Sequence, residues 1–278
     1  MEYIPNISII TLTKNDVEGF ICSAKSLLEQ NYFDLMEWII IDGSDFNIFK
    51  INQKYIELKF TKSYKKTFLN LKIKHIFANK KNVKGIYKSM NYGIKIASGK
   101  SIIFMNGGDE FFDKSSIRLL SNPLFENNFL STVCFGQAKI ISEIGIDWLF
   151  PGKKLKNIYN WLKFFEPNHQ AMLISIDIAK KTKFIESCKI SADKFWKKEV
   201  IRKASKLNYI EKPVCKFKLN GSSSKRPTFK VLSEQIIDKQ ISILRKLIIL
   251  LKFLIIPFFY KYFPFIQKSK SFVIDLFF

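Results

Sequence analysis

The chain has 278 residues, of which 46 are Lys or Arg and 24 are Asp or Glu, so its formal net charge is +22. Hydrophobic residues make up 47% of the sequence, and this apolar content excludes a disordered polyelectrolyte. The charge is uneven, because residues 1–150 hold 19 basic and 15 acidic side chains whereas residues 151–278 hold 27 and 9. We therefore expect a nearly neutral N-terminal domain followed by a basic region that meets an anionic partner.

The first half of the chain alternates predicted strands and helices. Short apolar, β-branched runs predict strands at residues 7–12, 38–41, 73–77 and 101–105. Helical spacing and capping residues predict helices over about 16–30, 50–71 and 85–97. This alternation is typical of a parallel α/β sheet, in which ligands bind beyond the carboxyl ends of the strands. Asp42 and Asp109 follow two of these strands and are expected at that edge.

The middle of the chain is less regular. Residues 132–141 and 171–176 are predicted as strands, and residues 148–167 are rich in aromatic residues and lysines. A polar, basic loop at 221–227 is expected to mark the end of the folded domain. The four cysteines are widely spaced without a C-x-x-C pair, which favours reduced thiols of a cytosolic protein.

Beyond about residue 231 the sequence has a different pattern of apolar, basic and aromatic residues. Apolar residues recur at helical spacing from Ile237 to Leu251 with lysines off that stripe, and aromatic residues follow Pro257. This pattern is typical of a helix that lies in a membrane surface. We expect residues 226–278 to form an amphipathic helical tail on an anionic membrane surface. The alternative is that the stripe packs on the protein's own core or on a second subunit.

No signal for export or membrane crossing is found in the sequence. The first apolar run, at residues 7–12, is too short for a signal peptide. No stretch of about 18 apolar residues is free of charge, so we expect no membrane-spanning helix.

Three sequence clusters carry a family resemblance. They are “ISIITLTKND…SLLEQ…EWIIIDGSD” at 7–45, “GIYKSMNYGIKIASGKSIIFMNGGDEFF” at 85–112, and “NHQA” at 168–171 followed by “ISADKF” at 190–195. In this order and spacing they resemble the family 2 glycosyltransferases, inverting enzymes of GT-A fold, over about residues 4–217. The similarity is greatest to the branch that builds bacterial surface polysaccharides.

The resemblance implies a domain organisation. Residues 1–225 would form a GT-A domain whose central sheet is mostly parallel and flanked by helices. Within it, residues 1–112 would bind the nucleotide sugar and residues 113–225 the acceptor, while residues 226–278 form the tail.

The resemblance also implies roles for individual residues. Asp109 would bind a divalent metal, Mn²⁺ or Mg²⁺, which stabilises the departing diphosphate. Asp193 would be the catalytic base that takes the acceptor's proton, and Asp42 would hydrogen-bond the nucleotide base. His169 and Gln170 would lie near the acceptor or the diphosphate. The remaining expected donor-binding residues are Thr11, Thr13, Lys84, Asn106 and Gly108.

Each of these residues also has a structural interpretation. Asp109 fits a turn, and Asp42 fits a helix cap or a turn. Asp193 is a candidate for an ion pair with Lys194 or Lys197, and a lone His such as His169 is often structural. Asn15 and Asp16 are expected only to cap the following helix.

Two departures from the family pattern concern acidic residues near the Gly-Ile-Tyr motif. Val83-Lys84 and Lys88 stand where the family often has carboxylates. Lys84 or Lys88 would contact donor phosphate, or else these positions mark a divergent or inactive copy. Glu110 would assist Asp109 in the metal motif.

We therefore predict an inverting glycosyltransferase at the cytoplasmic face of the cell membrane. It would move a sugar from a nucleotide-diphosphate donor, expected to be a UDP-sugar, to a glycan linked to polyprenyl diphosphate. The product would be an O-antigen, a capsule or an exopolysaccharide. A non-catalytic, membrane-bound partner of such an enzyme is the alternative.

Two other function classes are less favoured. A nucleotidyltransferase would need a Gly-rich, Arg-containing loop after the first strand, where this chain has “TLTKND”. A nucleic-acid-binding protein would need an aromatic strand motif, zinc-ligand spacing or a capped basic helix, so no nucleic-acid partner is expected.

Overall fold

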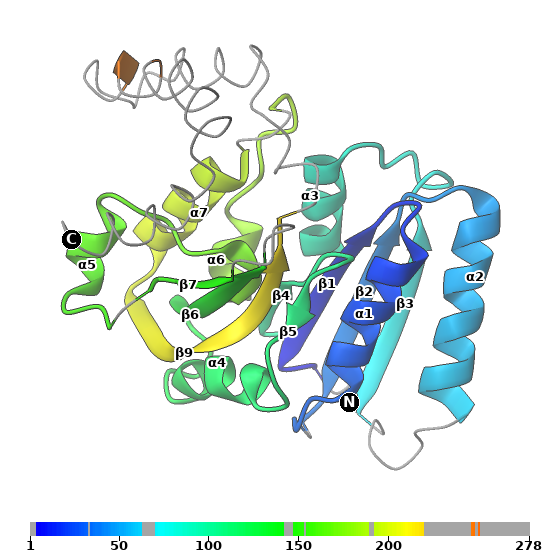
Figure 1. Cartoon of the computed structure of the whole chain (residues 1–278), viewed down its shortest axis with the longest axis horizontal. Coiled ribbons are helices and arrows are strands. Elements are labelled where there is room, and N and C mark those ends of the chain that lie inside the picture. Colours follow the sequence, from blue (N-terminus) through cyan, green and yellow to red (C-terminus); the bar gives the residue numbers. More distant parts are fainter. Residues whose placement is uncertain are drawn as a thin grey trace.

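The computed structural model describes residues 4–32, 34–62, 70–141, 147–152, 154–188 and 192–219, together with 246, 247 and 250 (Figure 1). The loop predicted at 221–227 lies outside these residues. The predicted tail at 226–278 also lies outside them, except for residues 246, 247 and 250.

The first half folds as alternating strands and helices. Its strands are β1 (Ile7–Thr13), β2 (Met36–Asp42), β3 (Leu71–Phe77) and β4 (Ser101–Phe104). Its helices are α1 (Val17–Leu28), α2 (Phe46–Ile56) and α3 (Ile86–Ile96), with a π-helical segment at Glu57–Lys62 after α2. The four strands predicted in this region are confirmed.

The helix predicted over 50–71 is wrong at both ends. Helix α2 begins at Phe46, directly after Asp45 at its N-cap. Leu71 is the first residue of β3, because Leu71, Lys72, Ile73 and Lys74 alternate apolar and polar side chains as a strand does.

The described residues of the second half add five strands and four helices. The strands are β5 (Glu110–Phe111), β6 (Thr132–Ile141), β7 (Trp148–Phe150), β8 (Met172–Ser175) and β9 (Lys206–Lys218). The helices are α4 (Ser116–Phe125), α5 (Ile158–Leu162), α6 (Ile176–Lys180) and α7 (Ala192–Lys203), with a 3₁₀ turn at His169–Ala171. Strand 132–141 is confirmed, whereas the strand predicted at 171–176 is shorter because the 3₁₀ turn and α6 flank it.

The described strands form one mixed sheet in the order β3-β2-β1-β4-β8-β6-β9-β5, with β7 on β6. Strands β3, β2, β1 and β4 are parallel, as predicted. Strand β8 is antiparallel to β4 and β6, and β9 is parallel to β6. The final strand pair, β9 with β5, brings the end of the described domain beside the segment that follows β4.

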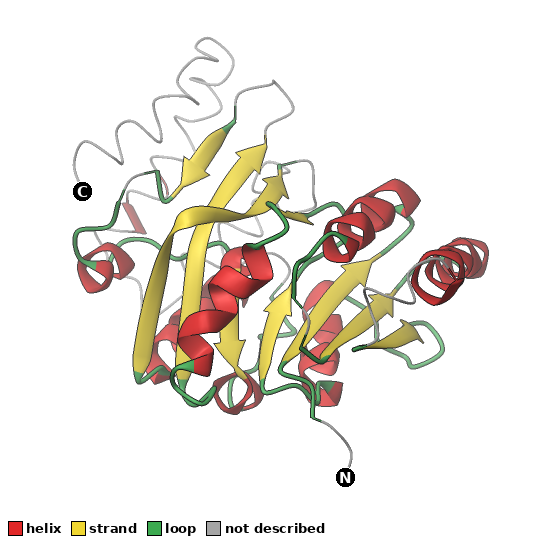
Figure 2. Ribbon diagram, turned by 90° about the horizontal axis from the view of Figure 1, so that it is seen from below, coloured by secondary structure: helices red, strands yellow, loops and turns green. Residues whose placement is uncertain are grey.

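Helices cover both faces of this sheet (Figure 2). Helices α1 and α4 pack on one face, in a core that includes Phe20 and Trp38. Helices α3, α6 and α7 pack on the other, in a core that includes Phe104 and Trp196. Successive strand residues point to opposite faces, so Ile9 enters one core and Ile10 the other. Burial on both faces explains the continuous apolar runs of the parallel strands.

The carboxylate of Glu37 lies inside this apolar sheet. Glu37 of β2 is fully buried, and its carboxylate accepts hydrogen bonds from Ser8 Oγ, Lys74 Nζ at 2.8 Å and Gly99 N at 3.0 Å. The backbone N–H and the hydroxyl of Ser98 also donate to it. Burial alone would raise the pKa of Glu37, but these donors hold it below its usual range. The carboxylate thereby joins β1, β2, β3 and the turn before β4.

Replacing Glu37 tests how far the fold depends on this carboxylate. Glu37→Leu removes the acceptor of the Ser8 and Ser98 hydroxyls and of the Ser98 amide, and leaves Lys74 Nζ and Gly99 N only with their second acceptors, Ile96 O and Ser8 Oγ. We expect the free energy of unfolding to fall by about 3 kcal/mol in chemical denaturation. The control is Glu126→Leu, at an exposed position, which should change it by no more than about 0.5 kcal/mol. Equal effects of the two substitutions would contradict the role given to Glu37.

Candidate functional site

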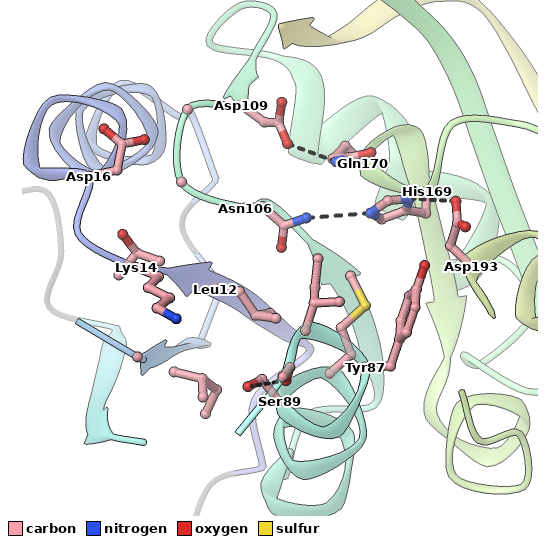
Figure 3. A pocket seen from close by; sticks show the side chains of 18 of the residues that line it. Leu12, Lys14, Asp16, Tyr87, Ser89, Asn106, Asp109, His169, Gln170 and Asp193 are labelled. Carbon is pink, nitrogen blue, oxygen red and sulfur yellow. Dashed lines mark hydrogen bonds and ion pairs between the residues drawn. The ribbon is translucent and has the colours of Figure 1, made fainter. Parts of the chain in front are cut away.

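A cavity of about 780 Å³ lies beyond the carboxyl ends of β1 and β4 (Figure 3). It is lined by the residues after these strands, the first turn of α3, the 3₁₀ turn, the start of α7 and the end of β9. Its volume is within the range of small-molecule sites, and its place agrees with the sequence-based expectation.

Two sequence motifs meet across this cavity. Asn106 Nδ2 lies 3.5 Å from His169 Nε2, and Gln170 Nε2 donates to Asp109 Oδ2 at 2.7 Å. The segment after β4 and the 3₁₀ turn are therefore joined by two side-chain pairs (Figure 3). The sequence predicted all four residues for the site, but not that they pair with one another.

Glycines allow the segment after β4 to approach β1 and α1 closely. A Cβ on Gly107 would lie 3.2 Å from Thr13 Oγ1, and Gly108 has a φ of +94°, which other residues rarely adopt. Ser23 Oγ of α1 donates to the backbone oxygen of Asp109 at 2.6 Å. These contacts fix the backbone from which the Asp109 side chain extends.

The Asp109 carboxyl is unusual because it is only 6% exposed. Burial raises its pKa to about 7, against the hydrogen bond from Gln170 and the nearby charge of Lys218, which favour ionisation. A carboxyl in this condition changes charge readily when a cation or an anion arrives.

The cavity residues fit a divalent cation that arrives with a phosphorylated ligand. Within the described ranges, no three His, Cys, Asp or Glu side chains gather in a group able to hold a metal ion. However, Asp109 shares the cavity with buried side-chain oxygens of Thr13, Asn106 and Gln170 that have no hydrogen-bond partner. Mg²⁺ and Mn²⁺ prefer oxygen ligands, and Mg²⁺ is often held by one or two carboxylates plus substrate phosphates.

Asp193 stands at the opposite side of His169 from Asn106. Its Oδ2 lies 3.9 Å from His169 Nδ1 and 3.6 Å from Lys197 Nζ, so the ion pair expected with Lys197 is present. Its side chain is 28% exposed and lines the cavity. Burial lowers the pKa of His169 to about 4, although the charge of Asp193 opposes this shift. His169 is therefore neutral at pH 7.

Asp42 and Thr11 do not line the cavity. The Asp42 carboxylate is fully buried and accepts from Asn52 Nδ2 at 2.8 Å, His75 Nε2 at 3.1 Å and Ser44 N at 2.9 Å. Burial would raise its pKa, but these bonds hold the pKa below its usual range. Thr11 Oγ1 accepts from the Trp38 indole at 2.9 Å. A contact of either residue with a nucleotide remains a prediction.

The lysines of the Gly-Ile-Tyr region differ in position. Lys84 lines the cavity beside the buried Val83, whereas Lys88 is exposed and is not among the lining residues. Glu110 Oε1 pairs with Lys218 Nζ at 3.0 Å and does not line the cavity either. Asp16 caps α1 by accepting from Gly19 N at 2.8 Å, as expected, and it also lines the cavity.

Several lining residues were not identified as site residues in the sequence. Lys14 and Tyr87 stand inside quoted motifs, so their neighbours gave a signal for them. No sequence signal indicated Lys218, because its position at the cavity depends on the pairing of β9 with β5. The polar lining residues that were not identified include Lys14, Tyr87, Ser89, Asn168, Lys197 and Lys218.

The sequence profile of glycosyl transferase family 2 matches residues 8–179 of the chain. This match covers β1 to α6 and both of the motifs that meet at the cavity. No curated protein sequence matches the chain.

Crystal structures of S. aureus TarS are similar in fold. TarS gives a TM-score of 0.56 at 17% identity, over 90% of this chain and 43% of TarS. TarS 1–349 with UDP gives 0.58 at 18% identity, over 90% of this chain and 70% of that one. TarS 1–349 with UDP-GlcNAc gives a TM-score of 0.56 at 17% identity, over 92% of this chain and 73% of that one. This chain thus spans less than half of TarS, and it has the GT-A-like α/β fold.

The neutral, buried His169 predicts a pH dependence of stability. Its pKa of about 4 is below the ordinary value of 6.5, so the unfolded chain binds more protons between these values. The stabilisation is complete above pH 6.5 and is lost as the pH falls towards 4. Relative to His169→Gln, the wild type should lose about 3 kcal/mol of unfolding free energy between pH 7 and pH 4. Urea denaturation at four pH values measures this, and parallel profiles of the two proteins would contradict it.

Proposed function

Because this chain belongs to glycosyl transferase family 2, we propose that it transfers a sugar from a nucleotide-diphosphate donor to an acceptor hydroxyl with inversion. One observation carries the proposal: the two candidate acids, Asp109 and Asp193, line a single cavity on either side of His169 (Figure 3). One acid can serve the leaving diphosphate while the other serves the attacking hydroxyl.

The donor is proposed to lie between β1 and the first turn of α3. Lys14 and Lys84 line this part of the cavity, and neither makes an ion pair with the acids of the described residues. Gly85, at the N-cap of α3, has a φ of +100° and no atom within 4 Å of the position that a Cβ would take. Phosphates are favoured at such a helix end. A UDP-sugar is the proposed donor, since TarS 1–349 has been crystallised with UDP and with UDP-GlcNAc.

Asp193 is proposed as the catalytic base. Direct displacement at the sugar needs a group that takes the proton of the attacking hydroxyl, and a carboxylate suits this role. The Lys197 ammonium lies 3.6 Å from Asp193 Oδ2 and forms an ion pair with it. His169 carries no charge at pH 7 and so does not compete with Lys197 for this carboxylate.

Asp109 is proposed to hold Mn²⁺ or Mg²⁺, with Asn106, Gly108 and Thr13 around the donor. The cation would supply positive charge to the departing diphosphate. Asp109 itself is positioned for this by its backbone contact to Ser23 and its side-chain contact to Gln170.

The acceptor is proposed to be a polyprenyl-diphosphate-linked glycan at the cytoplasmic face of the membrane, in the synthesis of an O-antigen, a capsule or an exopolysaccharide. The high positive charge of residues 151–278 and the amphipathic pattern of 226–278 support this. The domain limits are proposed as 1–112 for donor binding, 113–225 for acceptor binding and 226–278 for the membrane. None of the helices in the described part of the chain is long and apolar enough to cross a membrane.

A non-catalytic partner of a transferase is less well supported. It rests on Val83 and Lys88, where family members often carry acids. Val83 belongs to the buried core, and Lys88 does not line the cavity. Both candidate catalytic carboxylates are present, which favours an active enzyme.

Substitution of the two acids tests the proposed roles. Asp193→Asn should lower the rate of sugar transfer about 10²- to 10⁴-fold while UDP binding, measured by calorimetry, stays as in the wild type. Asp109→Ala should lower both transfer and metal-dependent UDP binding. Asp113→Asn, near the start of α4 and outside the cavity, serves as the control. Full transfer activity in both cavity variants would refute the assignment.

Removal of residues 231–278 tests the proposed membrane association. Because the pattern of this segment combines lysines with apolar and aromatic residues, its loss should shift the protein from vesicles of anionic lipid to the supernatant in a flotation assay. Circular dichroism and UDP binding show whether the shortened chain keeps its fold. Unchanged recovery with the vesicles would rule out this segment as the anchor.

A further inference from the structure

The Gln170 side chain is held in one place at the wall of the cavity. It is 2% exposed and belongs to the 3₁₀ turn between the cavity and β8. The Asn168 side chain accepts from the backbone N–H of Gln170 at 2.9 Å and so fixes the turn from which the side chain extends. The Gln170 amide therefore approaches Asp109 from a rigid support.

The contact with Asp109 has a defined direction. The Nε2 atom of Gln170 donates to Oδ2 of Asp109 at 2.7 Å, while Oε1 of Gln170 is buried without a partner. Gln170 therefore occupies Oδ2, and a backbone hydrogen bond from Lys218 also reaches the Asp109 carboxyl. Oδ1 is the oxygen that Gln170 leaves for a cation.

Other acids near the cavity differ from Asp109 in exposure and in their contacts. Glu110 Oε1 pairs with Lys218 at 3.0 Å, Asp193 pairs with Lys197 at 3.6 Å, and the exposed Asp16 uses Oδ1 to cap α1. Asp109 is the buried carboxyl among these four, and we take it as the cation ligand. How that one carboxylate is oriented then decides how well the cation binds.

We propose that Gln170 is a positioning residue, which holds Oδ2 of Asp109 so that Oδ1 faces the divalent cation bound with the donor diphosphate. This rests on the proposed function, in which Asp109 is the metal ligand. Groups that orient a metal ligand through a hydrogen bond commonly change metal affinity strongly when they are removed. Gln170 thereby acts on the metal site from the acceptor-binding half of the domain.

Mn²⁺ binding to the full-length chain tests the proposal without an activity assay. The free Mn²⁺ signal in electron paramagnetic resonance is recorded with and without UDP for the wild type, Asp109→Ala and two Gln170 variants. Gln170→Leu removes the donor, so Mn²⁺ binding in the presence of UDP should weaken about 10- to 100-fold. Gln170→Glu keeps the length of the side chain but also lacks the amide donor, so Mn²⁺ binding in the presence of UDP should weaken here too.

A loss of Mn²⁺ affinity in both variants separates positioning from a purely structural role when a matched buried glutamine outside the cavity shows no such loss. Gln137→Leu is that control, since Gln137 is also a buried glutamine, donates to Pro151 O at 2.9 Å and does not line the cavity. Unchanged Mn²⁺ binding in both Gln170 variants, or an equal loss in Gln137→Leu, would overturn the proposal while leaving Asp109 as the ligand. Unchanged binding in Asp109→Ala would overturn the metal site itself and the proposal with it.

Discussion

The buried carboxylate of Glu37 is the interaction on which the arrangement of the first four strands depends. It collects donors from β1, β3 and the turn before β4, all at the amino end of the sheet. A charge in such an apolar layer is tolerable only because every side of it meets a donor. With register fixed at this end, the residues that follow the strands at the opposite end are free to carry function.

Three buried carboxyls show how the same chemical group takes different charge states in one domain. Glu37 and Asp42 are surrounded by donors, which outweigh burial and keep their pKa values low. Asp109 has one strong side-chain donor, Gln170, and burial raises its pKa to about 7. The first two carboxylates hold the sheet and its edge together. Asp109 has fewer side-chain donors than the other two carboxyls, so a ligand can still contact it. This difference separates a candidate binding residue from the two structural ones.

Sequence patterns predicted the fold well where the signal is local. The apolar runs of the parallel strands and of β6 predicted the positions of these strands. The family motifs predicted Asp109, His169, Gln170 and Asp193 as site residues, and all four line one cavity. Asp42 was harder to predict, since its orientation depends on Asn52 and His75, which no local pattern links to it. Strand β9 was missed because its lysine-rich sequence becomes a strand only through pairing with β6 and β5.

The pairing of β9 with β5 has a consequence for how an acceptor reaches the site. Lys216 of β9 pairs with Glu110, the residue after Asp109 in the chain. Lys218, at the end of β9, lines the cavity. The chain therefore leaves the described domain at the mouth of the site. If the segment that follows binds a membrane surface, as proposed, that surface is joined to the site by only a few residues. An acceptor held on the surface would then have a raised effective concentration at the cavity.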